Sequence, residues 1–114
     1  MYYAAMETAT QSSVLARCGY ALSDPTRARI LLALREAGAY PSDLADLMGV
    51  SRQSLSNHLA CLRGCGLVVA APEGRRVRYE LADPRLGQAL ANLLSVVLAS
   101  DPERCADSAD KGCC

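Results

Sequence analysis

Cys61 and Cys65, four residues apart, are the side chains whose type and spacing most directly suggest chemistry. On a helix, side chains at this spacing leave one face with their Cβ atoms about 6 Å apart. Two thiolates can then share one ion, and sulfur ligands favour soft metals over Mg(II) or Ca(II). Two small apolar residues padding a helix flank would have the same spacing, so it leaves both interpretations open.

The position of this pair near the C-terminal end of a predicted helix has an electrostatic consequence. The negative end of the helix dipole disfavours a thiolate there, so we expect both thiols to be protonated at rest. A metal that binds thiolate strongly is then needed to displace the protons.

The other candidate ligands are weaker. His58 precedes Cys61 by three residues and could add a nitrogen ligand, but we prefer a hydrogen bond to the turn or to a DNA phosphate. Cys18 lies among apolar residues and is interpreted as packing. Cys113 and Cys114 could serve as a relay or as extra As(III) or Hg(II) ligands, and we assign them no role.

The composition fits one small domain that carries these residues. The chain has 114 residues, 51% of them hydrophobic, and contains no apolar window long enough to cross a membrane. Its start, MYYAAMETATQ, lacks the basic and apolar regions of a secretory signal. We therefore expect a cytoplasmic protein with reduced thiols rather than a disulfide framework.

Three helices are predicted before the recognition segment. The first ends near Gly19; the second begins at the Asp24–Pro25 cap and continues to Gly38. A short third helix, capped by Ser42 and Asp43, carries Leu44, Leu47 and Met48 and is stopped by Gly49.

The next predicted helix, capped by Ser51, has two distinct faces. Leu55, Leu59 and Leu62 form an apolar stripe that should face the core. A helix that follows a short Gly-containing turn in this way is typical of a helix-turn-helix. The polar remainder suits DNA: amides can pair with adenine, and hydroxyls can hold phosphate. The candidate contact residues are Arg52, Gln53, Ser54, Ser56, Asn57 and His58.

A β-hairpin follows, with LVVAA and VRYEL as strands and PEGRR as the charged turn. Arg75, Arg76 and Arg78 are candidates for phosphate or minor-groove contacts. From Ser51 to Tyr79 there are five arginines against one acidic residue, a net charge of plus four in a chain of zero net charge. This basic stretch favours a nucleic-acid partner.

The last predicted helix starts at Asp83–Pro84 and has an apolar arc wider than a one-sided surface helix needs. Leu86, Leu90, Leu93 and Val97 form its centre, which indicates a dimer interface. We therefore predict a folded domain over 1–100 and a mobile, acidic, cysteine-containing tail over 101–114.

Three segments carry a family resemblance: ALSDPTRARILLAL, DLADLMGVSRQSLSNHLACLRGCGLV and EGRRVRYEL. Together they resemble the ArsR/SmtB family of metal-responsive repressors. NHLACLRGCGLVVA with a tail cysteine resembles the cadmium- and lead-sensing CmtR branch most. The resemblance implies a mainly α fold with a β-hairpin, a homodimeric winged helix-turn-helix.

The sequence lacks two metal sites common in that family. AYPSDLADL has no cysteine pair on the helix before the turn, and the last helix has no histidine. The resemblance implies instead that Cys105 is the third ligand, the tail of one subunit reaching the Cys61–Cys65 pair of the other. The sequence itself leaves open whether the site closes within or between subunits.

The resulting prediction is a repressor, not an enzyme and with no membrane partner. As a homodimer it binds double-stranded operator DNA, and it dissociates when Cd(II) or Pb(II), with Hg(II) or As(III) as alternatives, binds Cys61, Cys65 and Cys105. The alternative is a thiol-redox-sensing repressor. An enzyme using Cys61 and His58 is disfavoured because no oxyanion loop or third orienting group accompanies them.

Overall fold

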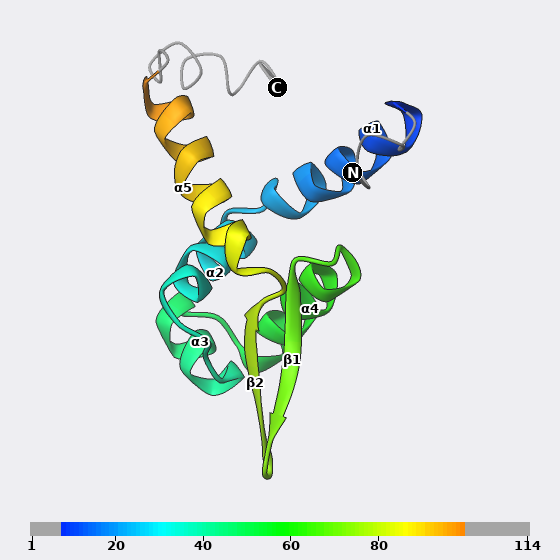
Figure 1. Ribbon diagram of the computed structural model, residues 1–114. Helices are drawn as coiled ribbons and strands as arrows, with labels where there is room; N and C mark the ends of the chain where they lie inside the picture. Colours follow the sequence, from blue (N-terminus) through cyan, green and yellow to red (C-terminus); the bar gives the residue numbers. More distant parts are fainter. Residues whose placement is uncertain (1–7, 100–114) are drawn as a thin grey trace.

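The computed structural model describes residues 8–99 as five α-helices and one β-hairpin (Figure 1). The architecture is the winged helix-turn-helix predicted from the sequence. The tail prediction for 101–114 falls outside the described residues. In chain order the elements are α1 Thr8–Leu22, α2 Pro25–Glu36, α3 Pro41–Met48, α4 Arg52–Gly64, β1 Val68–Glu73, β2 Arg76–Leu81 and α5 Pro84–Ala99.

The α1–α2 junction confirms one predicted boundary and corrects another. Asp24 is the N-cap of α2, where its carboxylate accepts a hydrogen bond from the Arg27 N–H at 3.0 Å. The first helix does not end near Gly19, as expected, but continues to Leu22. The side chain of Arg27 donates to carbonyls at the end of α1, which a local sequence pattern does not reveal.

The α3–α4 turn depends on a glycine. Gly49 has a φ of 70°, and its N–H donates to the carbonyls of Ala45 and Asp46. Ser51 caps α4 as predicted, accepting from the Ser54 N–H at 3.0 Å. The predicted cap of α3 is wrong, because that helix begins at Pro41, after Tyr40, which makes no side-chain cap bond. Proline at the first position sets this start.

The apolar stripe of α4 is the part of the core that fixes the orientation of this helix. Leu55, Leu59 and Leu62 are all at most 2% exposed. They join a single cluster with buried residues of α2, α3 and β1. Leu47 was expected to share the apolar pattern of α3, but it is 61% exposed. Burial of each leucine contributes roughly 1.5 to 3 kcal/mol and holds the opposite face of α4 toward solvent.

The hairpin pairs antiparallel from Val68 opposite Leu81 to Glu73 opposite Arg76. Only Gly74, at a φ of 63°, and Arg75 lie between the strands, so the predicted turn over 72–76 was too long. A two-residue turn with positive φ is typical of tight hairpins. Ala39 and Tyr79 exchange backbone hydrogen bonds of 2.9 and 2.8 Å, which attach the wing to the α2–α3 loop.

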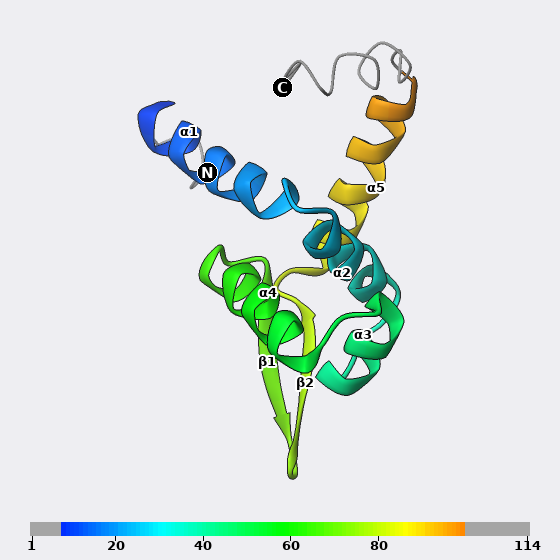
Figure 2. The ribbon, with the colours of Figure 1, turned by 180° about the vertical axis from the view of Figure 1, so that it is seen from behind.

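Helices α1 and α5 project from the body formed by the other elements, as Figures 1 and 2 show from opposite sides. Only the first half of α5 is packed: Gly87 and Leu90 are buried, whereas Leu93 and Val97 are about half exposed at 49% and 52%. None of the helices within 8–99 is long and apolar enough to cross a membrane.

Candidate metal site and DNA-binding surface

Cys61 and Cys65 lie together at the C-terminal end of α4. Cys65 is not inside the helix, as expected, but is its C-cap residue. Its backbone angles, φ −83° and ψ −4°, remain helical, and its N–H donates to the Cys61 carbonyl at 2.9 Å. The shared face required for two-sulfur ligation is therefore present, and both thiols are half-buried.

The environment of Cys65 holds its thiol in the protonated form. Burial raises its pKa most, and the neighbouring Cys61 raises it further. The positive charges of Arg17 and Arg27 act in the opposite direction but are weaker. The direction agrees with the sequence-based expectation, although the main cause is burial rather than the helix dipole.

Within residues 8–99, no group of three or more His, Cys, Asp or Glu side chains is placed to hold a metal ion. Cys61 and Cys65 are two of the three ligands predicted from the sequence, and their metal binding stays a prediction. Cys105, Cys113 and Cys114 lie outside the described residues. Cys18 is half-buried on α1, as expected for a packing residue, and forms no disulfide.

The polar face of α4 presents the predicted DNA-contact residues to solvent. Arg52, Gln53, Ser56 and Asn57 are exposed, whereas Ser54 is half-buried at the cap. The Gln53 amide donates to the Asn57 side-chain oxygen at 3.1 Å. This bond holds two amides side by side on the helix surface, and their contacts with base edges stay a prediction.

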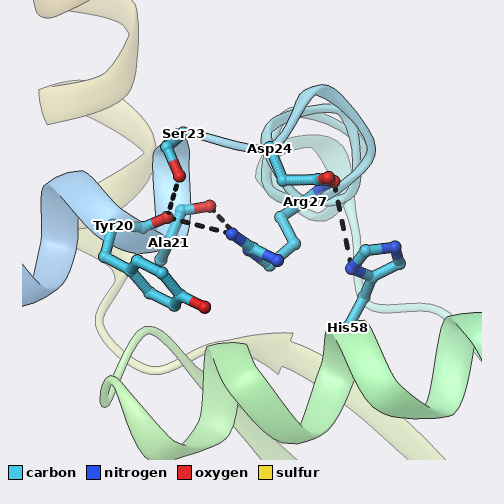
Figure 3. A network of polar contacts seen from close by, with 6 residues as sticks. All are labelled: Tyr20, Ala21, Ser23, Asp24, Arg27 and His58. Atoms are coloured by element: carbon cyan, nitrogen blue, oxygen red, sulfur yellow. Dashed lines mark hydrogen bonds and ion pairs between the residues drawn. The ribbon is translucent and has the colours of Figure 1, made fainter.

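Of the two partners expected for His58, the structure shows a contact other than the turn, and the contact with a DNA phosphate stays a prediction. His58 Nδ1 lies 3.9 Å from the Asp24 carboxylate at the start of α2, rather than against the helix-turn-helix turn (Figure 3). The Asp24 pKa is lowered, first by the hydrogen bond from the Arg27 N–H and also by the charges of His58 and Arg27. The histidine thus connects α4 to α2.

The wing arginines have three different surroundings. Arg75 lies exposed in the turn. Arg76 stacks on the Tyr40 ring with its guanidinium carbon 3.4 Å from the centroid, and the Tyr40 hydroxyl donates to Glu73. This bond to Glu73 raises the Tyr40 pKa.

Arg78 is half-buried at the base of the wing, with Glu80 at 3.7 Å and Glu73 at 4.0 Å. A side chain at Gly38 would collide with its guanidinium. Gly38 therefore allows the α2–α3 loop to pass close to the wing.

Comparison with known proteins decides the family. The model of the "Bacterial regulatory protein, arsR family" matches residues 24–69, which contain the helix-turn-helix and the cysteine pair. CmtR, an HTH-type transcriptional regulator of Mycobacterium tuberculosis, is 57% identical over 94 residues, covering 82% of this chain and 80% of the relative.

This chain belongs to the ArsR family. Another relative, the "Probable mercury resistance operon repressor" of Streptomyces lividans, is 34% identical and covers 81% of this chain and 72% of its own length.

Two solved structures place this ArsR-family protein among winged helix-turn-helix regulators. The NMR structure of the cadmium metal-sensor CMTR from M. tuberculosis has a TM-score of 0.63 at 60% identity, covering 75% of this chain and 90% of that one. A homodimeric winged helix-turn-helix DNA-binding domain from Mycobacterium bovis has a TM-score of 0.75 at 28% identity, covering 82% and 89%. The relatives are transcriptional regulators, which agrees with our interpretation of this chain as a regulator rather than an enzyme.

Sequence reasoning missed the polar residues around the α1–α2 junction. Arg27 and Tyr20 contact each other there, and Arg27 was not singled out because nothing local distinguishes it from other helix-surface arginines. The available signal was its position three residues after the Asp24 N-cap, next to the end of the preceding helix. Tyr40 at the wing had no comparable signal.

Proposed function

We propose that this ArsR-family protein is a metal-sensing repressor that binds operator DNA as a homodimer and releases it when a soft metal ion binds its cysteines. One observation carries the proposal: the adjacent thiols of Cys61 and Cys65 lie on the end of the same helix whose other face presents the DNA-contact residues. An event at these sulfurs can therefore alter the position of the recognition helix directly.

The donor chemistry fits a thiophilic ion. Two neighbouring sulfurs, with Cys105 as the third, suit Cd(II) or Pb(II), and also Hg(II) or As(III), better than hard cations. Zn(II) usually takes a fourth ligand in such sites. The raised pKa of Cys65 adds selectivity, because only an ion with strong affinity for thiolate competes with the proton. The relationship to CmtR, a cadmium sensor, supports the same choice.

The DNA surface consists of the outer face of α4 and the wing. Gln53 and Asn57 are suited to read base edges, whereas the arginines supply phosphate contacts. Arg75 is the most available wing residue, since Arg76 and Arg78 also contact Tyr40, Glu73 and Glu80. The proposed DNA-contact set is Arg52, Gln53, Ser54, Ser56, Asn57, His58, Arg75, Arg76 and Arg78.

The dimer surface is assigned to α1 and α5. An apolar groove of about 180 Å³ is lined by residues of α1, α2 and α5, including Leu22, Leu32, Leu93 and Val97. Exposed apolar side chains continue from it along both projecting helices, among them Leu15 and Val96. An apolar surface of this kind is typical of an interface, and the homodimeric M. bovis domain supports a second copy as its occupant.

The decisive experiment measures operator affinity of the reduced protein with and without saturating Cd(II), Pb(II), Hg(II) or As(III). Cys61→Ser and Cys65→Ser should lose tight Cd(II) binding and stay on the DNA. Cys105→Ser should still bind Cd(II), more weakly, but lose much of the release. Cys18→Ser is the matched control and should respond like the wild type.

Each arm can contradict the proposal. Full Cd(II)-driven release in Cys61→Ser would exclude the cysteine pair as the site, and full release in Cys105→Ser would exclude the tail ligand. Release of the wild type by peroxide, without release by any of the metals, would favour the thiol-redox alternative.

A further inference from the structure

Arg27 lies on α2, which packs against both α1 and α4, and its side chain caps the end of α1 (Figure 3). Its Nε donates to the Ala21 carbonyl at 2.9 Å, and its Nη2 donates to the Tyr20 carbonyl at 3.0 Å. Its guanidinium also lies over the Tyr20 ring, 5.1 Å from the centroid. The last carbonyls of a helix lack partners within the helix, so this guanidinium fixes the end of α1 against α2.

Asp24 extends the same network to the recognition helix. One of its carboxylate oxygens, Oδ2, accepts from the Arg27 N–H at 3.0 Å and lies 3.9 Å from His58 Nδ1. The side chains of His58 and Asp24 are only 20% and 34% exposed, so water screens this pair less than a fully exposed one. The cap of α2 is therefore also a contact with α4.

The network reaches α4 through His58, on the same helix as the cysteine pair. His58 precedes Cys61 by about one helical turn on α4. Arg27 also acts electrostatically on Cys65, where its charge opposes the pKa increase that burial causes. The network thus contacts α4 about one turn before Cys61, and its Arg27 holds the end of α1.

We propose that Asp24, Arg27 and His58 form a positioning junction that holds α4 relative to α1 in the DNA-binding arrangement and is released when the cysteine pair takes up metal. The inference rests on the proposed function. When Cys61 and Cys65 close on an ion, they fix the end of α4 about one turn after His58, and this acts on the His58–Asp24 contact. Because α1 carries part of the proposed dimer surface, loosening its end changes how the two recognition helices are placed.

The test compares Arg27→Gln with Arg29→Gln in the full chain. Both variants lose one positive charge from α2, but the hydrogen bond found for the Arg29 side chain within residues 8–99 is a long one, 3.4 Å to the Leu47 carbonyl. Operator affinity is measured by fluorescence anisotropy with and without saturating Cd(II), and Cd(II) binding by thiolate charge-transfer absorption. Without metal, Arg27→Gln should bind the operator about tenfold more weakly than the wild type. With Cd(II), its operator affinity should equal that of the Cd(II)-loaded wild type. It should bind as much Cd(II) as the wild type. Arg29→Gln should behave like the wild type.

Asp24→Asn separates positioning from capping. Asn caps helices as well as Asp, so this variant keeps the start of α2 but loses the charge that faces His58. The ratio of metal-free to Cd(II)-loaded operator affinity should fall at least threefold, whereas a residue that only caps would leave the ratio unchanged.

If Arg27→Gln unfolds cooperatively and keeps the wild-type ratio of metal-free to Cd(II)-loaded operator affinity, the proposal is overturned. If Arg27→Gln does not unfold cooperatively, the Asp24→Asn variant decides. A wild-type affinity ratio in Asp24→Asn then overturns the proposal. Failure of the proposed function gives a different result, because Cd(II) would then not release the wild type from the operator. The metal-free operator affinities of the wild type and the variants would still decide whether the junction positions α4.

Discussion

At the scale of single residues, the protonation of Cys65 sets how the proposed metal site responds to its ligand. Burial and the neighbouring Cys61 raise its pKa, so at neutral pH the pair does not exist as two thiolates. Ions that bind thiolate weakly cannot displace the proton, and the resting protein stays neutral at this position. In the proposed site, the same residues thereby discriminate against the abundant hard cations.

Apparent Cd(II) affinity should therefore rise with pH. Below the thiol pKa values, affinity should increase about tenfold per pH unit for each proton displaced. Competition with a chelator between about pH 6 and pH 8 measures this slope, and an affinity independent of pH would contradict it. In the metal-free protein, the raised pKa of Cys65 contributes to the stability of the folded state at pH values below the ordinary thiol pKa. This contribution is lost as the pH rises through the raised pKa.

Gln53 and Arg75 should divide DNA recognition between them. Gln53→Ala removes an amide that can pair with a base edge, and should relax sequence preference at one or two positions at a cost of roughly 1 to 3 kcal/mol. Arg75→Ala removes an exposed charge and should weaken binding to all duplexes alike, with a smaller salt dependence. Cd(II) binding should survive both changes. A binding-site selection in which Gln53→Ala keeps the full wild-type preference would contradict this assignment.

At the scale of elements, the turn between α3 and α4 sets the geometry of the DNA-binding unit. Gly49 has a left-handed backbone, and its N–H donates to the carbonyls of Ala45 and Asp46. Ser51 then starts α4 two residues later. This short connection leaves little freedom in the angle between the two helices, so strain here acts on the recognition surface as well as on stability.

Gly49→Ala should lower the free energy of unfolding by about 1 to 2 kcal/mol, because an L side chain disfavours the 70° φ. Gly19→Ala is a matched control: at both positions an added Cβ meets nothing within 4 Å, but Gly19 lies inside α1 without a positive φ. That control should gain about 0.5 to 1 kcal/mol. Urea denaturation measures both values, and equal effects would contradict the backbone explanation.

The order of elements could be predicted from the sequence because their signals are local. Periodic leucines locate α4, the Asp24–Pro25 pair locates the start of α2, and Gly49 marks the turn. The end of α1 could not be placed, since it depends on Arg27 of the next helix. The pairing of His58 with Asp24 also joins residues far apart in the chain, which no periodicity reveals. The spacing predicted that Cys61 and Cys65 share one face, whereas their role as metal ligands, with Cys105 as the third, rests on the family resemblance.

At the scale of the whole molecule, this chain cannot bury all of its apolar surface alone. Leu93, Leu94, Val96, Val97 and Leu98 are each 40% to 67% exposed on the projecting half of α5. Reading a palindrome also requires two recognition helices at a fixed separation. A dimer through α1 and α5 meets both requirements, and it connects the proposed metal-dependent junction to the spacing between the recognition helices.

Leu93→Glu should convert the dimer into a monomer and weaken operator binding by at least about a hundredfold, because a single recognition helix loses the benefit of joint binding to both half-sites. Leu93 lines the apolar groove, so a carboxylate there would be buried without a partner in the dimer. Gln88→Glu is the control: this exposed residue donates to Asn92 at 2.9 Å on the opposite face of α5, and its substitution should leave both properties unchanged. Sedimentation equilibrium and fluorescence anisotropy measure the two effects. If Leu93→Glu remained dimeric with wild-type operator affinity, the interface would have to lie elsewhere, and metal binding could not act on DNA through the arrangement of α1 and α5.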